Sequence, residues 1–196
     1  MLSEIFKLFW KTVERKDERR INSQTPPTEI EQFCDIQYID DGLWQHRLDV
    51  YSKSDKFSHR PVIIDIHGGG WMYGTKEINK NYCLVLAQND YVVVNINYRL
   101  APDFSVADQL RDCFFAFKWV STNIERYGGD LNNVFVTGDS AGGFLAAYSA
   151  LLNSSDKLRK IFGVTESGLE FKACGLTSPV CFMNTHTFQD VYYSRV

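Results

Sequence analysis

The sequence predicts an α/β fold in which a mostly parallel sheet carries helices on both faces. Three continuous apolar, β-branched runs, at 61–66, 91–97 and 133–137, are typical of strands buried on both sides. Helix-like segments at 77–89 and 108–127 lie between them. Strands and helices that alternate in this way form a parallel sheet flanked by helices.

The N-terminal segment is predicted to be one amphipathic helix. Its apolar residues recur at helical spacing from Leu2 to Val13. We expect the helix to end before Asn22, because Pro26-Pro27 blocks any continuation. The basic cluster at 15–20 is interrupted by acids, which favours a solvated helix face over a polyanion site.

Two strands are expected next, at 33–39 and 44–51, around Asp40-Asp41-Gly42. A glycine that follows aspartate favours a hairpin turn. An antiparallel pair is therefore predicted to precede the parallel part of the sheet.

The long helix at 108–127 is expected to direct Leu110, Phe114 and Phe117 toward the sheet and to end at Gly128-Gly129. After it the sequence predicts the strand at 133–137, a small-residue helix at 141–152, one connection and one strand at 171–180. No internal repeat or low-complexity tract interrupts this order, which suits one domain.

Residues 138–142 read Gly-Asp-Ser-Ala-Gly and lie between a predicted strand and a predicted helix. A sharp turn at this place lifts the Ser140 hydroxyl out of the backbone, and only glycine-sized neighbours tolerate it. A second motif, His67-Gly68-Gly69-Gly70-Trp71, follows the strand at 61–66. A nucleophile and an oxyanion loop in this order indicate a serine hydrolase.

With these two motifs and Asn97-Tyr98-Arg99-Leu100-Ala101-Pro102, the chain resembles the hormone-sensitive-lipase-like branch of the α/β-hydrolases, the HGGG carboxylesterases. The resemblance covers roughly residues 33–182. It implies cleavage of carboxylic esters through an acyl-serine intermediate, with a small ester as substrate and without metal or cofactor. It also implies residues 1–30 as an N-terminal, cap-like helical segment and residues 31–196 as the hydrolase core.

The resemblance assigns roles to single residues. Ser140 would be the nucleophile, and the backbone amides of Gly69, Gly70 and Ala141 would form the oxyanion hole. Loss of one such donor typically costs about 3–4 kcal/mol of transition-state stabilisation. His67 would hold the oxyanion loop rather than act as the base.

Neighbouring residues are interpreted from the sequence itself. Asp139 is not expected to be the triad acid, because adjacent side chains on a tight turn diverge. Arg99 and Asp103 are expected to brace their loop. Trp71 and Tyr73 either line an acyl pocket or belong to the core.

A triad also needs an acid and then a histidine after the serine. We identify neither; His186 is the one histidine that follows Ser140, and it is a weak candidate. The core is therefore expected to be truncated at its C-terminus. The alternative function is a catalytically inactive hydrolase or a binding scaffold. The strand at 171–180 would then be an open edge, with Leu176, Val180 and Phe182 near solvent, through which copies could associate.

Composition and charge narrow the expected partners and location. The net charge of −3 gives no reason to expect nucleic acid as a partner. No apolar run is long enough for a transmembrane helix, and the N-terminus lacks the features of a signal peptide. Five scattered cysteines without metal-type spacing favour reduced thiols and a cytoplasmic location.

Overall fold

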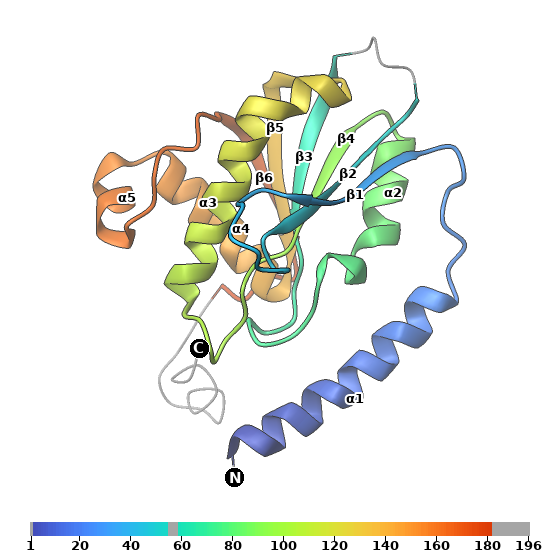
Figure 1. The fold of residues 1–196 in the computed structure, drawn as a ribbon, viewed down its shortest axis with the longest axis vertical. Coiled ribbons are helices and arrows are strands. Elements are labelled where there is room, and N and C mark those ends of the chain that lie inside the picture. The colour runs from blue at the N-terminus through green and yellow to red at the C-terminus, as the bar shows by residue number, and fades with distance from the viewer. Residues whose placement is uncertain (1, 55–58, 182–196) are drawn as a thin grey trace.

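The computed structural model, which describes residues 2–54 and 59–181, contains a six-stranded sheet with helices on both faces (Figure 1). The strands run in the order β1-β2-β4-β3-β5-β6 across the sheet. β1 pairs antiparallel with β2 and β2 with β4, whereas β4, β3, β5 and β6 are parallel. The predicted α/β fold is confirmed. The strands are β1 (Glu31–Gln37), β2 (Arg47–Ser52), β3 (Arg60–Ile66), β4 (Val92–Ile96), β5 (Gly129–Asp139) and β6 (Phe171–Thr177).

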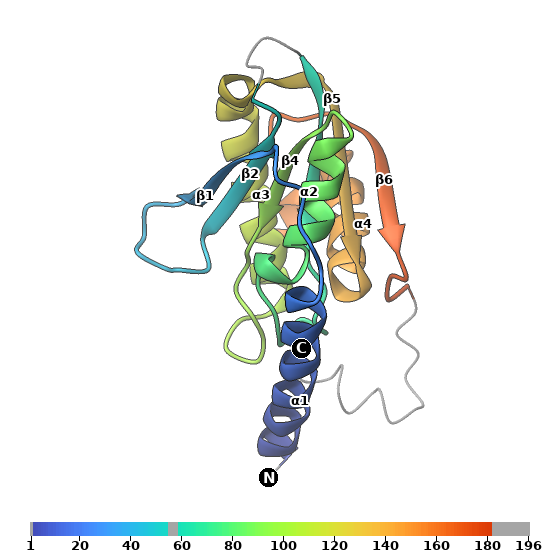
Figure 2. The ribbon, with the colours of Figure 1, turned by 90° about the vertical axis from the view of Figure 1, so that its right-hand side faces the viewer.

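The helices form two layers and one outlying element. α2 covers one face of the sheet, and α3 and α4 cover the other (Figure 1). α1 lies past the carboxyl ends of the parallel strands (Figures 1 and 2). The α-helices are α1 (Leu2–Asn22), α2 (Lys80–Gln88), α3 (Val106–Asn123), α4 (Ser140–Asn153) and α5 (Asp156–Phe162), and the 3-10 turns are η1 (Lys76–Ile78) and η2 (Ile124–Tyr127).

Each face of the sheet has its own apolar cluster. Val93 packs with Cys83 and Leu84 on the α2 side. Ile64 and its neighbours on the parallel strands pack with Phe117 and other residues of α3 and α4. Because both faces are covered, these strands need apolar residues at successive positions, which explains their continuous β-branched runs.

The strand order places a topological switch at β3. β4 and β5 are the two neighbours of β3 in the sheet. The chain goes from β3 through α2 to β4, whereas β5 leads into α4, on the face of the sheet opposite to α2. Loops that follow two such neighbouring strands diverge, which leaves a crevice at their carboxyl ends where ligands bind. The glycine motif follows β3 and Ser140 follows β5, so both predicted motifs meet at this crevice.

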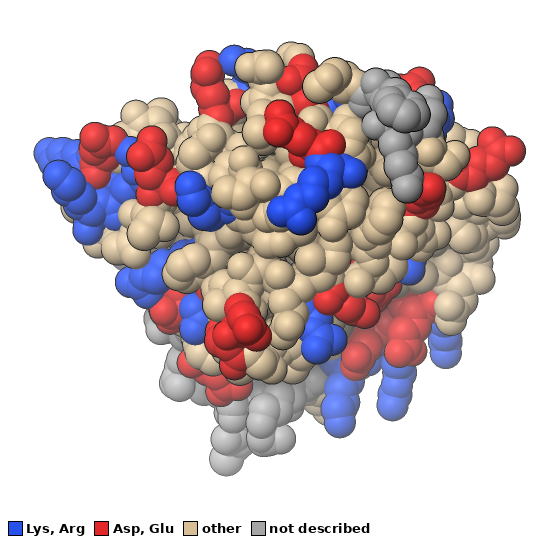
Figure 3. Space-filling model, turned by 45° about the horizontal axis from the view of Figure 1, so that its top comes forward, with Lys and Arg blue, Asp and Glu red and all other residues tan. Residues whose placement is uncertain are grey.

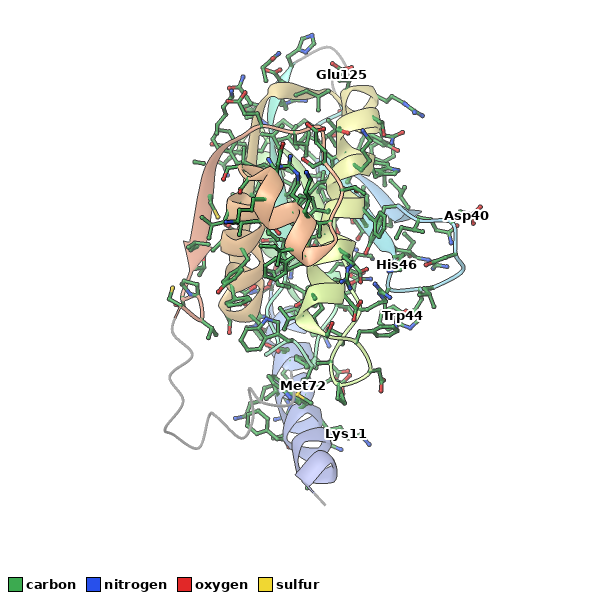
Figure 4. All side chains as sticks on the ribbon, turned by 90° about the vertical axis from the view of Figure 1, so that its left-hand side faces the viewer. Lys11, Asp40, Trp44, His46, Met72 and Glu125 are labelled. Atoms are coloured by element: carbon green, nitrogen blue, oxygen red, sulfur yellow. The ribbon has the colours of Figure 1, made fainter. Side chains whose placement is uncertain are left out.

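The connection between β1 and β2 differs from the predicted tight turn, since it extends from Tyr38 to His46. Within it, Asp41 accepts a hydrogen bond from the Leu43 amide at 3.0 Å and lies 2.7 Å from His46 Nδ1. His46 is buried, with its Nε2 3.2 Å from Asp112 of α3 (Figure 4). β1 and β2 still pair antiparallel, but a longer connection that contains this contact takes the place of the tight turn, and β2 begins only at Arg47.

Two further elements differ from the expected ones. The helix expected at 77–89 is divided at Asn79 into η1 and α2. A short helix, α5, occupies the connection before β6; Ser155 caps its start and Gly163, with φ of 63°, ends it. β6 itself ends at Thr177 rather than at Val180.

β6 lies at the edge of the sheet within the described residues and pairs with β5 alone. Leu176 on this strand is 42% exposed, as expected for an edge. Phe182 lies outside the described residues.

On the face shown in Figure 3, acidic and basic side chains are interspersed rather than gathered into one charged field. Of the helices that the structure describes, none is both long enough and apolar enough to span a bilayer.

Candidate active site

Ser140 lies at the turn between β5 and α4 and has a φ of +50°. Such a left-handed conformation costs a non-glycine residue about 1–3 kcal/mol. Close packing of the flanking glycines holds it in place: a Cβ on Gly138 would lie 2.5 Å from the Gly142 carbonyl, and one on Gly142 would lie 2.0 Å from the Ile66 oxygen. The predicted strand-turn-helix context of Ser140 is therefore present.

The glycine loop, defined here as residues 67–71, follows β3. Gly69 and Gly70 have φ values of 118° and 57°. The Gly69 carbonyl accepts hydrogen bonds from the amides of Met72 (3.2 Å) and Tyr73 (3.0 Å), which closes a tight turn. A Cβ on Gly69 would lie 2.0 Å from the Tyr73 oxygen, so this turn requires glycine.

His67 is fully buried and does not line the cavity described below. Its Nδ1 donates to the Gly68 carbonyl at 2.7 Å, and its ring stacks on Tyr98 with 4.4 Å between centroids. Burial lowers the pKa of His67 to about 4, so the ring is neutral near pH 7. These contacts fit a residue that holds the loop.

Asp139 connects the two motifs. Its Oδ1 accepts hydrogen bonds from the Gly68 amide at 2.9 Å and from Asn79 Nδ2 at 2.8 Å. The carboxylate thus faces the glycine loop, which fits the expectation that it is not the triad acid. Sequence reasoning did not assign this link or the role of Asn79, because both depend on which strands are neighbours.

Trp71, Tyr73 and Arg99 have three different environments. Trp71 belongs to the core, edge-on against Phe144, whereas Tyr73 lines the cavity. Arg99 binds Asp112 through two side-chain nitrogens and its backbone amide, and lies over the Phe104 ring. Arg99 therefore braces its loop, as expected.

One cavity of about 410 Å³ brings the predicted residues together. Ser140, Gly69 and Gly70 line it, and Ala141 follows Ser140 as a buried residue at the start of α4. Asp65, Asn79 and Asp139 line the same cavity.

α1 forms the opposite wall of this cavity, through Trp10, Val13, Asp17 and Arg20. Trp10 stacks on Tyr73 with 5.2 Å between centroids, and the Tyr73 hydroxyl donates to Asp17 at 3.3 Å. A second cavity, of about 560 Å³, shares the Trp10–Tyr73 pair and extends toward Lys11, Met72 and Trp44 (Figure 4). The aromatic pair therefore separates two adjoining cavities.

The partners of the serine are not brought together in the described residues. No histidine of this part of the chain lines the cavity with Ser140. Glu170 is 83% exposed and pairs with Lys172 at the amino end of β6, away from the crevice. His186, the weak candidate, lies outside the described residues. Within the described residues, no group of three or more His, Cys, Asp or Glu side chains could hold a metal ion.

The fold, with its two loops at the switch point, is that of the α/β-hydrolases. A family model described as BD-FAE matches residues 48–176, and the chain belongs to that family. The resemblance to α/β-hydrolase carboxylesterases is thereby confirmed.

Individual relatives agree. The chain is 35% identical over 112 residues to the versiconal hemiacetal acetate esterase of Dothistroma septosporum, covering 57% of this chain and 33% of that protein. It is 31% identical to the isoprenylcysteine alpha-carbonyl methylesterase ICME of Arabidopsis thaliana, covering 59% of this chain and 27% of the relative. The matched part thus spans about a third or less of these relatives.

Among solved structures, esterase B from Lactobacillus rhamnosis inhibited by a tributyrin phosphonate matches with a TM-score of 0.92 and 31% identity. The match covers 99% of this chain and 62% of that one. The arrangement of elements described above is therefore that of an esterase fold.

Proposed function

We propose that this protein hydrolyses carboxylic esters, with Ser140 as the nucleophile. The observation that carries the proposal is the cavity that Ser140 shares with Gly69 and Gly70, at the carboxyl ends of β3 and β5. Family membership and the esterase relatives support the same reaction.

In this proposal Ser140 Oγ attacks the ester carbonyl carbon, and the carbonyl electron pair moves onto its oxygen. The amides of Gly69, Gly70 and Ala141 donate to that oxyanion. The serine proton passes to a base, for which His186 is a weak candidate. The oxyanion then re-forms the carbonyl, the bond from the carbonyl carbon to the alkoxy oxygen breaks, and the base gives the proton to the departing alkoxide. Water then attacks the acyl carbonyl carbon and gives its proton to the base. The bond to Ser140 Oγ breaks, the base returns the proton to that oxygen, and the acid is released.

Hydrolysis of a p-nitrophenyl ester of a short acid tests this function. We expect Ser140→Ala to lower kcat by about 10⁶-fold, the loss known when a serine hydrolase loses its nucleophile. Ser154→Ala is the matched control, since Ser154 is an exposed serine just past the same helix. Equal rates in wild type and Ser140→Ala, or no turnover by the folded chain, would favour the alternative of a non-catalytic scaffold.

We also propose that α1 acts as a cap on the nucleophile cavity. Its support is the wall that α1 forms, tied to the core through Tyr73–Asp17 and through Arg20, whose Nη2 donates to the Ile78 carbonyl at 3.3 Å. Residues 1–30 would then be the cap-like segment and residues 31–196 the catalytic core.

Self-association through β6 is a further proposal. Because an unpaired strand edge with exposed apolar residues attracts other strands, we expect the sedimentation coefficient to rise with protein concentration. Leu176→Lys should reduce that rise, whereas Leu151→Lys, at an exposed residue of α4, should not. A constant monomeric value would contradict the proposal.

A cytoplasmic location is supported by the five cysteines, all of which are free thiols. The proposed reaction needs no cofactor, metal or nucleic acid.

A further inference from the structure

The side chain of Asn79 bridges two carboxylates beside the proposed site. Its Nδ2 donates to Asp65 Oδ2 at 2.9 Å and to Asp139 Oδ1 at 2.8 Å. A side-chain amide has two hydrogens, so both are used. The three residues and Ser140 line one cavity.

The bridge continues into the glycine loop. Asp139 Oδ1 also accepts the hydrogen bond of the Gly68 amide, at 2.9 Å. The contact is close: a Cβ on Gly68 would lie 2.4 Å from Asp139 Oδ2. A continuous path of hydrogen bonds therefore runs from Asp65 through Asn79 and Asp139 to the Gly68 amide.

Asp65 is an unusual residue for a central strand. It lies on β3, between β4 and β5, and is 1% exposed. Asp65 is paired in register with Asn95 of β4 and Thr137 of β5. The other polar and titratable groups around it are Asn79, Asp139, Cys83 and Tyr82, with His67 just past the end of β3 and Asp17 and Arg20 of α1 across the cavity. An isolated carboxylate at such a depth is costly to keep charged.

Burial raises the pKa of Asp65 to about 7; the Asn79 hydrogen bond opposes this rise and the Asp139 charge adds to it. Asp65 therefore titrates near neutral pH rather than in acid. An ionised Asp65 attracts the Asn79 amide more strongly than a neutral one, and so draws it away from Asp139, which accepts the second amide hydrogen.

We propose that Asp65 is a positioning residue of the oxyanion loop, acting on the Gly68 amide through Asn79 and Asp139. The importance of this position for catalysis rests on the proposed function. The hydrogen-bond path itself does not, because it is present without substrate.

NMR of the full chain tests the path without any turnover. The carboxyl ¹³C signal of Asp65 and the amide signal of Gly68 are followed in wild type between pH 5.5 and 8.5. We expect the Gly68 amide to move with the same midpoint as the Asp65 carboxyl, near 7. A Gly68 amide that does not move at the Asp65 midpoint would overturn the proposal, and this comparison needs no variant.

Asp65→Asn keeps the size and the acceptor for Asn79 but cannot ionise. The Gly68 titration should disappear in this variant and remain in Asp130→Asn, at the opposite end of β5. A titration that survives in Asp65→Asn would show that another group causes it. If the protein hydrolyses esters, kcat of the wild type should change with pH at the Asp65 midpoint, and this change should be absent in Asp65→Asn. If the protein does not hydrolyse esters, the NMR result still tests the hydrogen-bond path.

Discussion

Gly142→Ala is expected to destabilise the protein by about 3 kcal/mol, near the upper end for overpacked sites. The added Cβ would lie 2.0 Å from the Ile66 oxygen and 2.4 Å from the His67 oxygen, and neither backbone atom can rotate away. Alanine is a better helix former than glycine, by about 1 kcal/mol, and this gain does not offset the clash. Denaturant unfolding of wild type and variant measures the difference.

Catalysis should suffer as well, because relief of the clash moves α4 and the Ser140 turn away from the glycine loop. A misplacement of about 1 Å can cost about 10²-fold in rate. Gly175→Ala is the matched control: its Cβ would meet a side-chain atom, Thr137 Oγ1, at 3.2 Å on the exposed edge strand. An effect of Gly142→Ala no larger than that of Gly175→Ala would contradict the packing argument.

Asp112→Ala should cost about 3–5 kcal/mol, the range for removal of one partner from a buried ion pair. Asp112 is fully buried, and its carboxylate binds Arg99 at 2.7 Å and lies 3.2 Å from His46 Nε2. The variant would leave two cationic groups without this partner, Arg99 in the loop after β4 and His46 in the connection between β1 and β2. Denaturant unfolding at pH 6 measures the loss.

The loss should also depend on pH. Burial opposes protonation of His46, but Asp112 and Asp41 outweigh it and raise the pKa of His46 above its usual 6.5. The contribution of His46 to the free energy of unfolding is therefore fully present below about pH 6.5, and it is lost as the pH rises through the raised pKa. The difference in free energy of unfolding between wild type and Asp112→Ala should therefore become smaller toward pH 9. It should not vanish, because Arg99 stays charged. Glu170→Ala, at the exposed pair with Lys172, is the control and should cost about 0–1 kcal/mol.

The parallel strands and the two motif loops could be predicted from the sequence, because each signal is local. A β-branched run buried on both faces identifies β4, and Gly-x-Ser-x-Gly after a strand identifies the turn at Ser140. The short helix α5 also carried local signals, a serine at its start and Gly163 at its end.

The remaining features depend on contacts between distant residues. Asp40–Gly42 predicted a tight turn, but the structure has a longer connection there, in which His46 is buried against Asp112. The hydrogen bond from the Gly68 amide to Asp139 requires β3 and β5 to be neighbours. The hydrogen bond from Asn79 to Asp65 requires the end of η1 to lie against β3. No periodicity or spacing in one chain specifies such pairs.

The central claim is that Ser140 is an activated nucleophile, and covalent labelling tests it most directly. The full chain is treated with a fluorophosphonate, its intact mass is measured, and the modified peptide is sequenced. Such reagents react rapidly with a serine whose proton is taken by a base. We predict one adduct, located on Ser140 and absent from Ser140→Ala. A folded wild-type chain that stays unmodified, or an adduct on another residue, would contradict the claim.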